Sequence, residues 1–312
     1  MSSRCPSGRR GAGSPRPGRT RVRKTLSNTM PVVLVHGSWH GSWCWSPVVE
    51  QLAARGVPSV AVDLEGHGLR NPAPRTYGAR PFDRTAFEAE PSPVAQVTAS
   101  SAAADLMDRI RMIGGGRPCL LVAHSLGGVV VTAVSELDPE LVGGLVYVAA
   151  YAPVSGTPAR DYNSRSEMSG SHVPPLVVGD PARAGALRVD PRDPDRRAEI
   201  KEAFYNDLDD RTADAAIGLL SPDAPVRILS ETLTVTEHRY GSIPHAYVVC
   251  TLDNAIPPAM QRHFIKEIDA VSVAPTTVTE LEASHSPFLS QPGALAEAIA
   301  AAAVHPYGLV GN

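Results

Sequence analysis

The 312-residue sequence lacks the features that mark several large classes of protein. No apolar run approaches the roughly 18 to 20 residues that a membrane-spanning helix needs, so we expect no membrane partner. The four cysteines, Cys5, Cys44, Cys119 and Cys250, have no CxxC spacing and are too few for a disulfide framework or a zinc ribbon. Aromatic residues are scarce at 5%, but 43% of residues are hydrophobic, which is enough for a sizeable core. These features predict a cytoplasmic protein with one large or two ordinary domains.

Acidic and basic side chains nearly balance, at 32 and 29, but they are unevenly distributed. Residues 1–28 carry eight basic side chains and no acidic one, so the remainder is strongly acidic and is not expected to bind nucleic acid. Residues 1–29 are rich in Gly, Pro and Ser and have no hydrophobic periodicity, which predicts a disordered basic tail. This tail could be a nucleic-acid or membrane arm, or an extension with no role in the fold. An export signal is disfavoured because no apolar segment follows Arg9 and Arg10.

After Met30, short apolar runs alternate with amphipathic stretches, which is typical of βαβ units and a parallel sheet. Six apolar runs are predicted to be strands: 31–35, 58–64, 118–123, 141–150, 245–251 and 276–282. Five stretches are predicted to be helices: 46–56, 93–113, 126–137, 257–269 and 292–303. The pattern predicts an α/β protein with a mostly parallel, doubly wound sheet of about six strands.

One interval breaks this alternation. Residues 154–243 contain clustered Pro and Asp, predicted helices at 193–208 and 212–220, and no convincing strand. An insertion of about 90 residues is too long for an ordinary loop, so we interpret 154–243 as a helical cap or lid. The α/β core would then comprise residues 30–153 and 244–312.

The sharpest local signal surrounds Ser125. An apolar run ends in the sequence AHSLGG and continues as a predicted helix, which is the pattern of a nucleophile elbow. Such a turn leaves little room beside the serine, and Gly127 supplies that room, whereas Ala123 departs from the usual glycine. The alternative is that Ser125 merely caps the helix.

A serine nucleophile needs a base, and the base needs a carboxylate to orient it. In a parallel sheet these partners should follow the carboxyl ends of later strands. Asp253 directly follows the run 245–251 and His285 follows the run 276–282, which gives the chain order Ser, Asp, His. We therefore predict Ser125, Asp253 and His285 to form a catalytic triad. The alternatives are a helix cap for Asp253 and a loop residue for His285.

The loop after the first strand, HGSWHGSWCW, is the second strong signal. A developing oxyanion needs two fixed N–H donors, usually one after the nucleophile and one from this loop. These would be the amides of Leu126 and Ser38. Trp39 and His40 of the same loop are candidates for the substrate pocket.

No cofactor or metal is expected. His36 and His40 have i, i+4 spacing, but the neighbouring glycines indicate a loop and the Glu of a zinc helix is missing. Gly66-His67-Gly68 lacks the third glycine of a dinucleotide fingerprint, and no P-loop is present.

Five motifs together resemble the α/β-hydrolase superfamily, in particular the branch that holds plant methyl esterases, hydroxynitrile lyases and related bacterial esterases: VVLVHGSWHGSWCW, DLEGHG, VAHSLGG, CTLDNAIP and ASHSPFLSQP. The similarity covers residues 31–303 and is weak across 154–243. It implies Ser125 as nucleophile, His285 as base and Asp253 as its orienting partner. It also implies oxyanion donors at Ser38 and Leu126, and a cap that shapes the pocket.

Two departures favour a hydrolase over a lyase. The lyases of this branch have Thr at the position of Gly37, and a Lys follows their catalytic His where this chain has Ser286. Without that cation a departing anion is poorly stabilised. We therefore predict a cofactor-independent serine hydrolase that cleaves a small or medium carboxylic ester through an acyl-enzyme. The alternatives are a lyase that uses the same triad and a non-catalytic ligand-binding protein on this fold.

Overall fold

Six parallel strands form the central sheet, in the order β2-β1-β3-β4-β7-β8. The computed structural model describes Met1 and residues 29–304. The strands are β1 (Val32–Val35), β2 (Ser59–Val62), β3 (Cys119–His124), β4 (Val142–Val148), β7 (His245–Cys250) and β8 (Thr277–Leu281). Five of them lie within predicted runs and β3 extends one residue beyond the run 118–123, to His124, so the predicted parallel sheet is confirmed. Nearly all of the predicted tail 1–29, with Cys5, and residues 305–312 lie outside the described residues.

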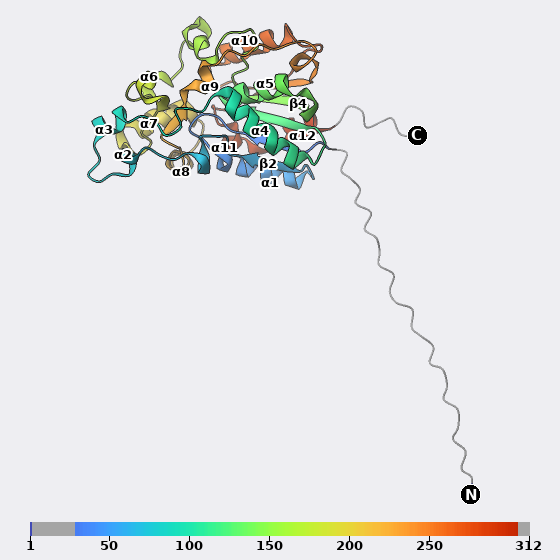
Figure 1. Ribbon diagram of the computed structural model, residues 1–312, viewed down its shortest axis with the longest axis horizontal. Coiled ribbons are helices and arrows are strands. Elements are labelled where there is room, and N and C mark those ends of the chain that lie inside the picture. Colours follow the sequence, from blue (N-terminus) through green and yellow to red (C-terminus); the bar gives the residue numbers. More distant parts are fainter. Residues whose placement is uncertain (2–28, 305–312) are drawn as a thin grey trace.

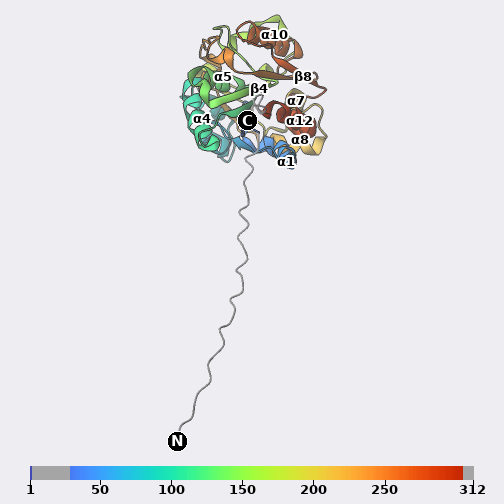
Figure 2. The same ribbon diagram turned by 90° about the vertical axis from the view of Figure 1, so that its right-hand side faces the viewer.

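Helices cover both faces of the sheet (Figures 1 and 2). One apolar cluster joins the sheet to α1 (Ser46–Ala54), α11 (Pro287–Ser290) and α12 (Pro292–Ala303). The other joins it to α4 (Ala99–Gly114), α5 (Gly127–Leu137) and α10 (Pro258–Asp269). Because both faces are covered, strands such as β1 and β3 consist almost entirely of buried apolar side chains.

Helix α4 begins later than the sequence predicts. The prediction started it at residue 93, but the helix starts at Ala99 behind a capping box. The Thr98 hydroxyl accepts the N–H of Ser101 and the Ser101 hydroxyl accepts the N–H of Thr98, each at 3.1 Å. The extended backbone of Thr98 separates the helix from the preceding turns.

Most of residues 154–243 lie at one end of the sheet (Figure 1), whereas the last part returns along α5, where the Thr236 hydroxyl donates to the Glu136 carboxylate at 2.9 Å. Their elements are η4 (Ala159–Ser164), η5 (Ser166–Met168), η6 (Pro174–Leu176), α6 (Pro181–Ala184), β5 (Ala186–Arg188), α7 (Pro194–Phe204), α8 (Asp210–Gly218), β6 (Asp223–Pro225), α9 (Val226–Ser230) and η7 (Tyr240–Ser242). The expectation of no strand is wrong, because β5 and β6 pair antiparallel. Strands of three residues are too short to give an alternating pattern.

A second segment packs against these residues. The connection between β2 and α4 contains η2 (Gly68–Arg70), α2 (Arg75–Gly78) and α3 (Arg84–Ala89), and α3 lies beside α6 and α7 in Figure 1. The Arg188 side chain, at 0% exposure, joins the two segments. It pairs with both carboxylate oxygens of Asp223 at 2.7 and 2.8 Å and donates to the carbonyls of Phe87 and Glu90.

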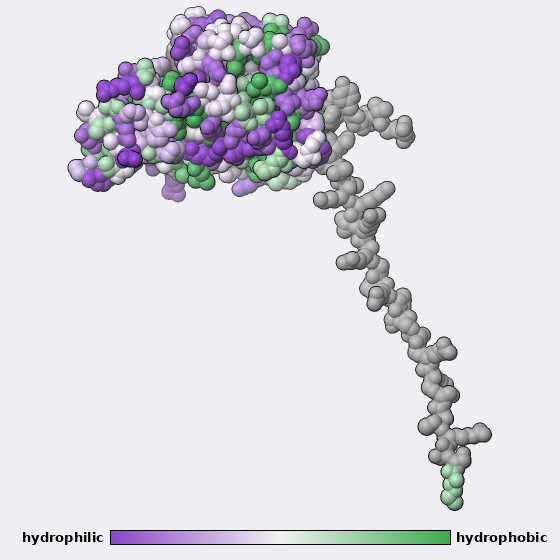
Figure 3. Space-filling model, in the orientation of Figure 1, coloured by the Kyte–Doolittle hydropathy of each residue, from purple (hydrophilic) through white to green (hydrophobic). Residues whose placement is uncertain are grey.

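Hydrophobic residues on the face shown in Figure 3 are scattered among hydrophilic ones. Among the described residues, no helix combines the length and apolar character needed to cross a bilayer.

Candidate active site

Ser125 lies on a sharp turn between β3 and α5. Its φ is +51°, in the left-handed region that residues with side chains rarely adopt. Two glycines permit the turn: a Cβ on Gly127 would lie 2.5 Å from the His36 carbonyl oxygen, and a Cβ on Gly37 would lie 2.5 Å from the Ser125 Cβ. Residue 126 caps α5 without a side-chain hydrogen bond, so Ser125 does not act as the N-cap.

His285 and Asp253 meet beyond β8 and β7. The His285 Nδ1 donates to Asp253 Oδ2 at 2.8 Å, and the two side chains are almost fully buried. The other carboxylate oxygen accepts the N–H groups of Ala255 and Ile256 at 2.7 and 2.9 Å. Helix α10 begins only at Pro258, so Asp253 does not cap it.

The amide of Gln261 also donates to Asp253 Oδ2, at 3.1 Å. The carboxylate therefore has four donors around it, which compensate a charge that is costly to bury. With its Nδ1–H held by the carboxylate, the neutral His285 ring presents Nε2 as an acceptor.

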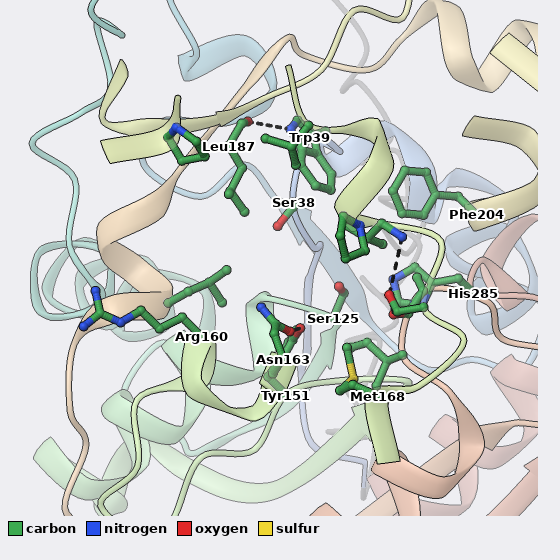
Figure 4. Close-up of a pocket in the computed structure, with 18 of the residues that line it drawn as sticks. Ser38, Trp39, Ser125, Tyr151, Arg160, Asn163, Met168, Leu187, Phe204 and His285 are labelled. Carbon is green, nitrogen blue, oxygen red and sulfur yellow. Dashed lines mark hydrogen bonds between the residues drawn. The ribbon is translucent and has the colours of Figure 1, made fainter. Parts of the chain in front are cut away.

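Ser125 and His285 line the same cavity, and Figure 4 shows their side chains on one wall of it. Among the described residues the Ser125 hydroxyl makes no hydrogen bond. Catalytic hydrogen bonds in unliganded sites often form only when substrate binds, so this geometry allows the proton transfer that the sequence predicts.

The two predicted oxyanion donors both belong to residues near Ser125. Ser38 lines the cavity, and Leu126 follows Ser125 at the start of α5. Within residues 29–304 neither amide N–H is used in a hydrogen bond. Both amides thus stay available to an oxygen anion beside Ser125.

The structure separates the two candidate pocket residues. Trp39 lines the cavity, and its Nε1 donates to the Leu187 carbonyl at 2.9 Å (Figure 4). His40 does not line the cavity. Its side chain points into the protein and the residue is 1% exposed. The ring bonds the Ser38 carbonyl and the Tyr205 hydroxyl, each at 2.8 Å. Burial lowers the pKa of His40 to about 3, so the ring is neutral.

A cavity of about 810 Å³ opens in front of Ser125. Most of its lining comes from residues 154–243, with apolar side chains predominating: Met168, Val173, Pro174, Val177, Pro181, Leu187, Phe204 and Leu229. A polar edge is formed by Arg160, Asn163 and Tyr151, and the Tyr151 hydroxyl donates to Asn163 Oδ1 at 2.9 Å. Sequence reasoning did not identify these residues, because those of 154–243 belong to a segment without readable periodicity and Tyr151 directly follows a predicted strand.

His124 is a further residue of the site that sequence reasoning missed. Its ring lies 4.4 Å from that of His285, and its Nε2 bonds the His285 carbonyl at 2.8 Å. Burial holds the pKa of His124 well below its usual value, so the ring is neutral and orients the His285 backbone. Its position as the last residue of a buried strand offered no signal of this contact.

A serine on a strained strand-to-helix turn, with a carboxylate and a histidine following later parallel strands, is the arrangement of an α/β hydrolase. The chain belongs to the alpha/beta hydrolase family, whose model matches residues 32–298. The resemblance found in the sequence is thereby confirmed.

The relatives include plant esterases and a bacterial hydrolase. Methylesterase 7 of Arabidopsis thaliana is 29% identical over 85% of this chain and 93% of its own. Methyl jasmonate esterase 1 of Vitis vinifera is 28% identical over 83% and 91%. The pyrethroid hydrolase of Sphingobium wenxiniae is 28% identical over 86% of each chain.

Solved structures share the fold. The pyrethroid hydrolase PytH superposes with a TM-score of 0.67 at 24% identity, covering 88% of this chain and 96% of its own. Polyneuridine aldehyde esterase superposes with a TM-score of 0.65 at 22% identity, covering 87% and 98%.

Proposed function

We propose that the protein is a serine hydrolase that cleaves small or medium carboxylic esters. The observation that carries this proposal is the arrangement at the cavity: Ser125 on a strained turn, beside a histidine already paired with the buried Asp253. The esterase names of the relatives support the same reaction class.

The reaction begins with attack of the Ser125 oxygen on the ester carbonyl carbon, while His285 Nε2 takes the hydroxyl proton. The resulting oxyanion accepts the N–H groups of Ser38 and Leu126. Loss of one such donor costs about 2.7 to 4 kcal/mol of transition-state stabilisation in known hydrolases. Asp253 holds the ring in the required tautomer and stabilises the imidazolium.

Collapse of the tetrahedral species breaks the bond to the alcohol, which leaves with the proton from His285. Water then attacks the acyl-enzyme with His285 again as base, and the acid is released as Ser125 regains its proton. Each step needs only this chain's residues and water.

Residues 154–243 act as a cap in this proposal and shape the substrate pocket. The predominantly apolar walls and the volume of about 810 Å³ suit an ester with a hydrophobic acyl or alcohol part. The relatives named for methyl jasmonate and pyrethroids are in line with this class. Three free thiols at Cys44, Cys119 and Cys250 support placing the protein in a reducing compartment, and we propose the cytoplasm.

Turnover of p-nitrophenyl acetate and butyrate by the purified full-length chain tests the proposal. Ser125→Ala should abolish steady turnover. Ser135→Ala is the matched control, because Ser135 is also buried but bonds only the Val131 carbonyl within α5. Undiminished turnover by Ser125→Ala would contradict the proposed nucleophile.

Mandelonitrile cleavage separates the lyase alternative. A Cβ at Gly37 would press against the Ser125 side chain, so the lyases' Thr does not fit this backbone without a shift of the loop. We expect no mandelonitrile cleavage. Cleavage of mandelonitrile without ester turnover would overturn the esterase proposal, and binding of esters without turnover would indicate a non-catalytic receptor.

A further inference from the structure

The last residue of α7 and the three residues that follow it contact three separate loops of the candidate active site. We call Phe204–Asp207 the brace segment. Its contacts are the Phe204 ring with the His285 ring at 5.8 Å, the Tyr205 hydroxyl with His40 Nε2 at 2.8 Å, the Asn206 amide with the Leu252 carbonyl at 3.1 Å, and the Asp207 carboxylate with the Ser284 N–H at 2.9 Å. One short piece of the cap thus reaches the loops that carry the histidine, the aspartate and an oxyanion donor.

The contacts of His40 with Ser38 and Tyr205 determine which nitrogen of the His40 ring carries the proton. The Ser38 carbonyl can only accept, so His40 Nδ1 must carry the ring proton. A neutral ring then has a lone pair at Nε2, which accepts the Tyr205 hydroxyl proton. Burial lowers the pKa of His40 to about 3 and raises that of Tyr205 well above its usual value, which favours these protonation states.

The backbone conformation of the loop that these bonds hold is unfavourable by itself. Trp39, between Ser38 and His40, has a φ of +60°, in the left-handed region. The cap also holds Trp39 directly, because its Nε1 donates to the Leu187 carbonyl and its carbonyl accepts the N–H of Ser221, at 2.9 and 2.8 Å. The strained loop therefore depends on partners about 150 to 180 residues further along the chain.

We propose that Tyr205 is a positioning residue for the oxyanion site. Its hydroxyl fixes the His40 tautomer, and His40 fixes the Ser38 carbonyl and with it the Ser38–Trp39 peptide. This limits rotation of the Ser38 backbone and so holds the preceding peptide, whose N–H is the proposed oxyanion donor. The cap is then part of the catalytic apparatus as well as a wall of the pocket. This inference rests on the proposed ester hydrolysis.

Removal of the Tyr205 hydroxyl leaves His40 Nε2 without a donor in a site where both side chains are 1% exposed or less. The ring can satisfy Nε2 by moving, or by shifting its proton to Nε2, and the proton shift breaks the bond to the Ser38 carbonyl. Either response loosens the loop without changing any group that touches substrate.

Tyr205→Phe tests the proposal with p-nitrophenyl butyrate and with an alkyl trifluoromethyl ketone. The Ser125 oxygen adds to the ketone carbonyl, His285 takes the proton, and the oxyanion of the hemiketal occupies the oxyanion site. We expect kcat to fall about 10- to 100-fold with KM within about twofold. The inhibition constant of the ketone should rise by the same factor as kcat/KM falls, because both report oxyanion stabilisation.

Tyr240→Phe is the matched control. Tyr240 is also fully buried, and its hydroxyl bonds only the Tyr147 hydroxyl at 3.1 Å, in the apolar cluster of the sheet. This variant should lose thermal stability as Tyr205→Phe does, while kcat and the inhibition constant stay unchanged. Equal kinetic losses in both variants would assign the effect to general loosening and overturn the proposal.

His40→Gln provides a second route to the same loop and serves if Tyr205→Phe folds poorly. It should reduce kcat and weaken the binding of the ketone. The double variant Tyr205→Phe/His40→Gln should lose no more kcat than the more impaired of the two single variants. Unchanged kcat and inhibition in folded Tyr205→Phe, with Ser125→Ala still inactive, would refute the positioning role alone. Absence of ester turnover in the unsubstituted protein would instead refute the proposed function.

Discussion

The central sheet and residues 154–243, the proposed cap, are stabilised in different ways. Strands β1 and β3 bury continuous apolar side chains between two helical layers, so their stability comes from non-directional burial. The cap contains a fully buried arginine that is bidentate to Asp223 and also bonds two carbonyls of the β2–α4 connection. We expect the sheet to tolerate many apolar sequences, whereas the cap combines an apolar cluster with a buried ion pair whose partners must be kept or replaced together.

The candidate active site lies between these two regions and draws on both. The sheet presents Ser125, Asp253 and His285 at the ends of its strands, and the cap supplies the cavity walls and the brace segment. We call Ser38–His40 the oxyanion loop. We therefore expect substitutions in the sheet near Ser125 to disturb the turn at that residue. Substitutions in the cap should disturb stability, pocket shape and the oxyanion loop.

The largest effect should follow Gly127→Val. The added Cβ would lie 2.5 Å from the His36 carbonyl oxygen and 3.2 Å from that of Val35, and neither backbone atom can move without shifting the oxyanion loop. Ester turnover should fall more than about 100-fold, since a misplacement of about 1 Å has that effect. Steady-state kinetics and a thermal melt measure it.

Gly218→Ala is the contrasting substitution in the cap. Nothing lies within 4 Å of a Cβ at Gly218, the last residue of α8, so the variant should keep full activity and gain up to about 1 kcal/mol of stability. Comparable activity losses in the two glycine variants would contradict a difference between the regions.

Arg188→Met should produce the next largest effect. It leaves the Asp223 carboxylate buried without its partner, which costs about 3 to 5 kcal/mol in unfolding free energy. The double variant Arg188→Met/Asp223→Leu should recover most of that loss, because apolar pairs often replace buried ion pairs at little cost. Urea unfolding measures both. Equal stability of the single variant and the original chain would show that the pair contributes nothing to the cap.

The sequence predicted the sheet because apolar runs report burial directly: five strands lie within the predicted runs, and β3 exceeds its run only by His124. It misplaced the start of α4, since Thr98 and Ser101 were not recognised as a capping box. It missed β5 and β6, whose three residues each give no pattern.

The candidate site divides in the same way. The positions of Ser125, Asp253 and His285 after strands could be predicted from chain order, although their catalytic roles remain predictions. His40 was predicted to reach the pocket because it follows Trp39 in the same loop. Its buried position could not be foreseen, because its partner Tyr205 lies 165 residues away in a segment without readable periodicity. Local sequence reports which loop a residue belongs to, but not which distant side chain turns it inward.

The pH dependence of stability reports the burial of His245 in the sheet, and His245→Gln should reduce that dependence. Burial at the start of β7 lowers the pKa of His245 to about 4, against about 6.5 in an unfolded chain. Between these values the unfolded state binds more protons, so stability falls as the pH falls from 6.5 toward 4. At pH 5 this group alone costs about 2 kcal/mol relative to pH 7.

The variant should therefore lose less stability than the original chain between pH 7 and pH 5, by about 2 kcal/mol. Urea unfolding across that range measures the difference in slope. Identical slopes would show that His245 is protonated in the folded sheet.

The smallest effects concern the helix caps of the two regions. Thr98 caps α4 beside the sheet, and the Asp209 carboxylate caps α8 by accepting the N–H groups of Arg211 and Thr212 at 3.0 and 3.1 Å. Thr98→Ala should cost about 1 kcal/mol, and Asp209→Ala should also lower the stability, each with unchanged ester turnover.

The unfolding curves of these two variants test whether the sheet and the cap are separate folding units. The apolar cluster of the cap includes Trp39 and Ala255, which belong to loops of the sheet, so the cap's own core is shared. We therefore expect a single cooperative transition that both variants shift, in urea unfolding followed by circular dichroism and by proteolysis. If Asp209→Ala instead produces a separate early transition with cleavage confined to 154–243, the cap unfolds independently. The brace segment would then leave the oxyanion loop whenever the cap opens, and turnover should be lost at the early transition.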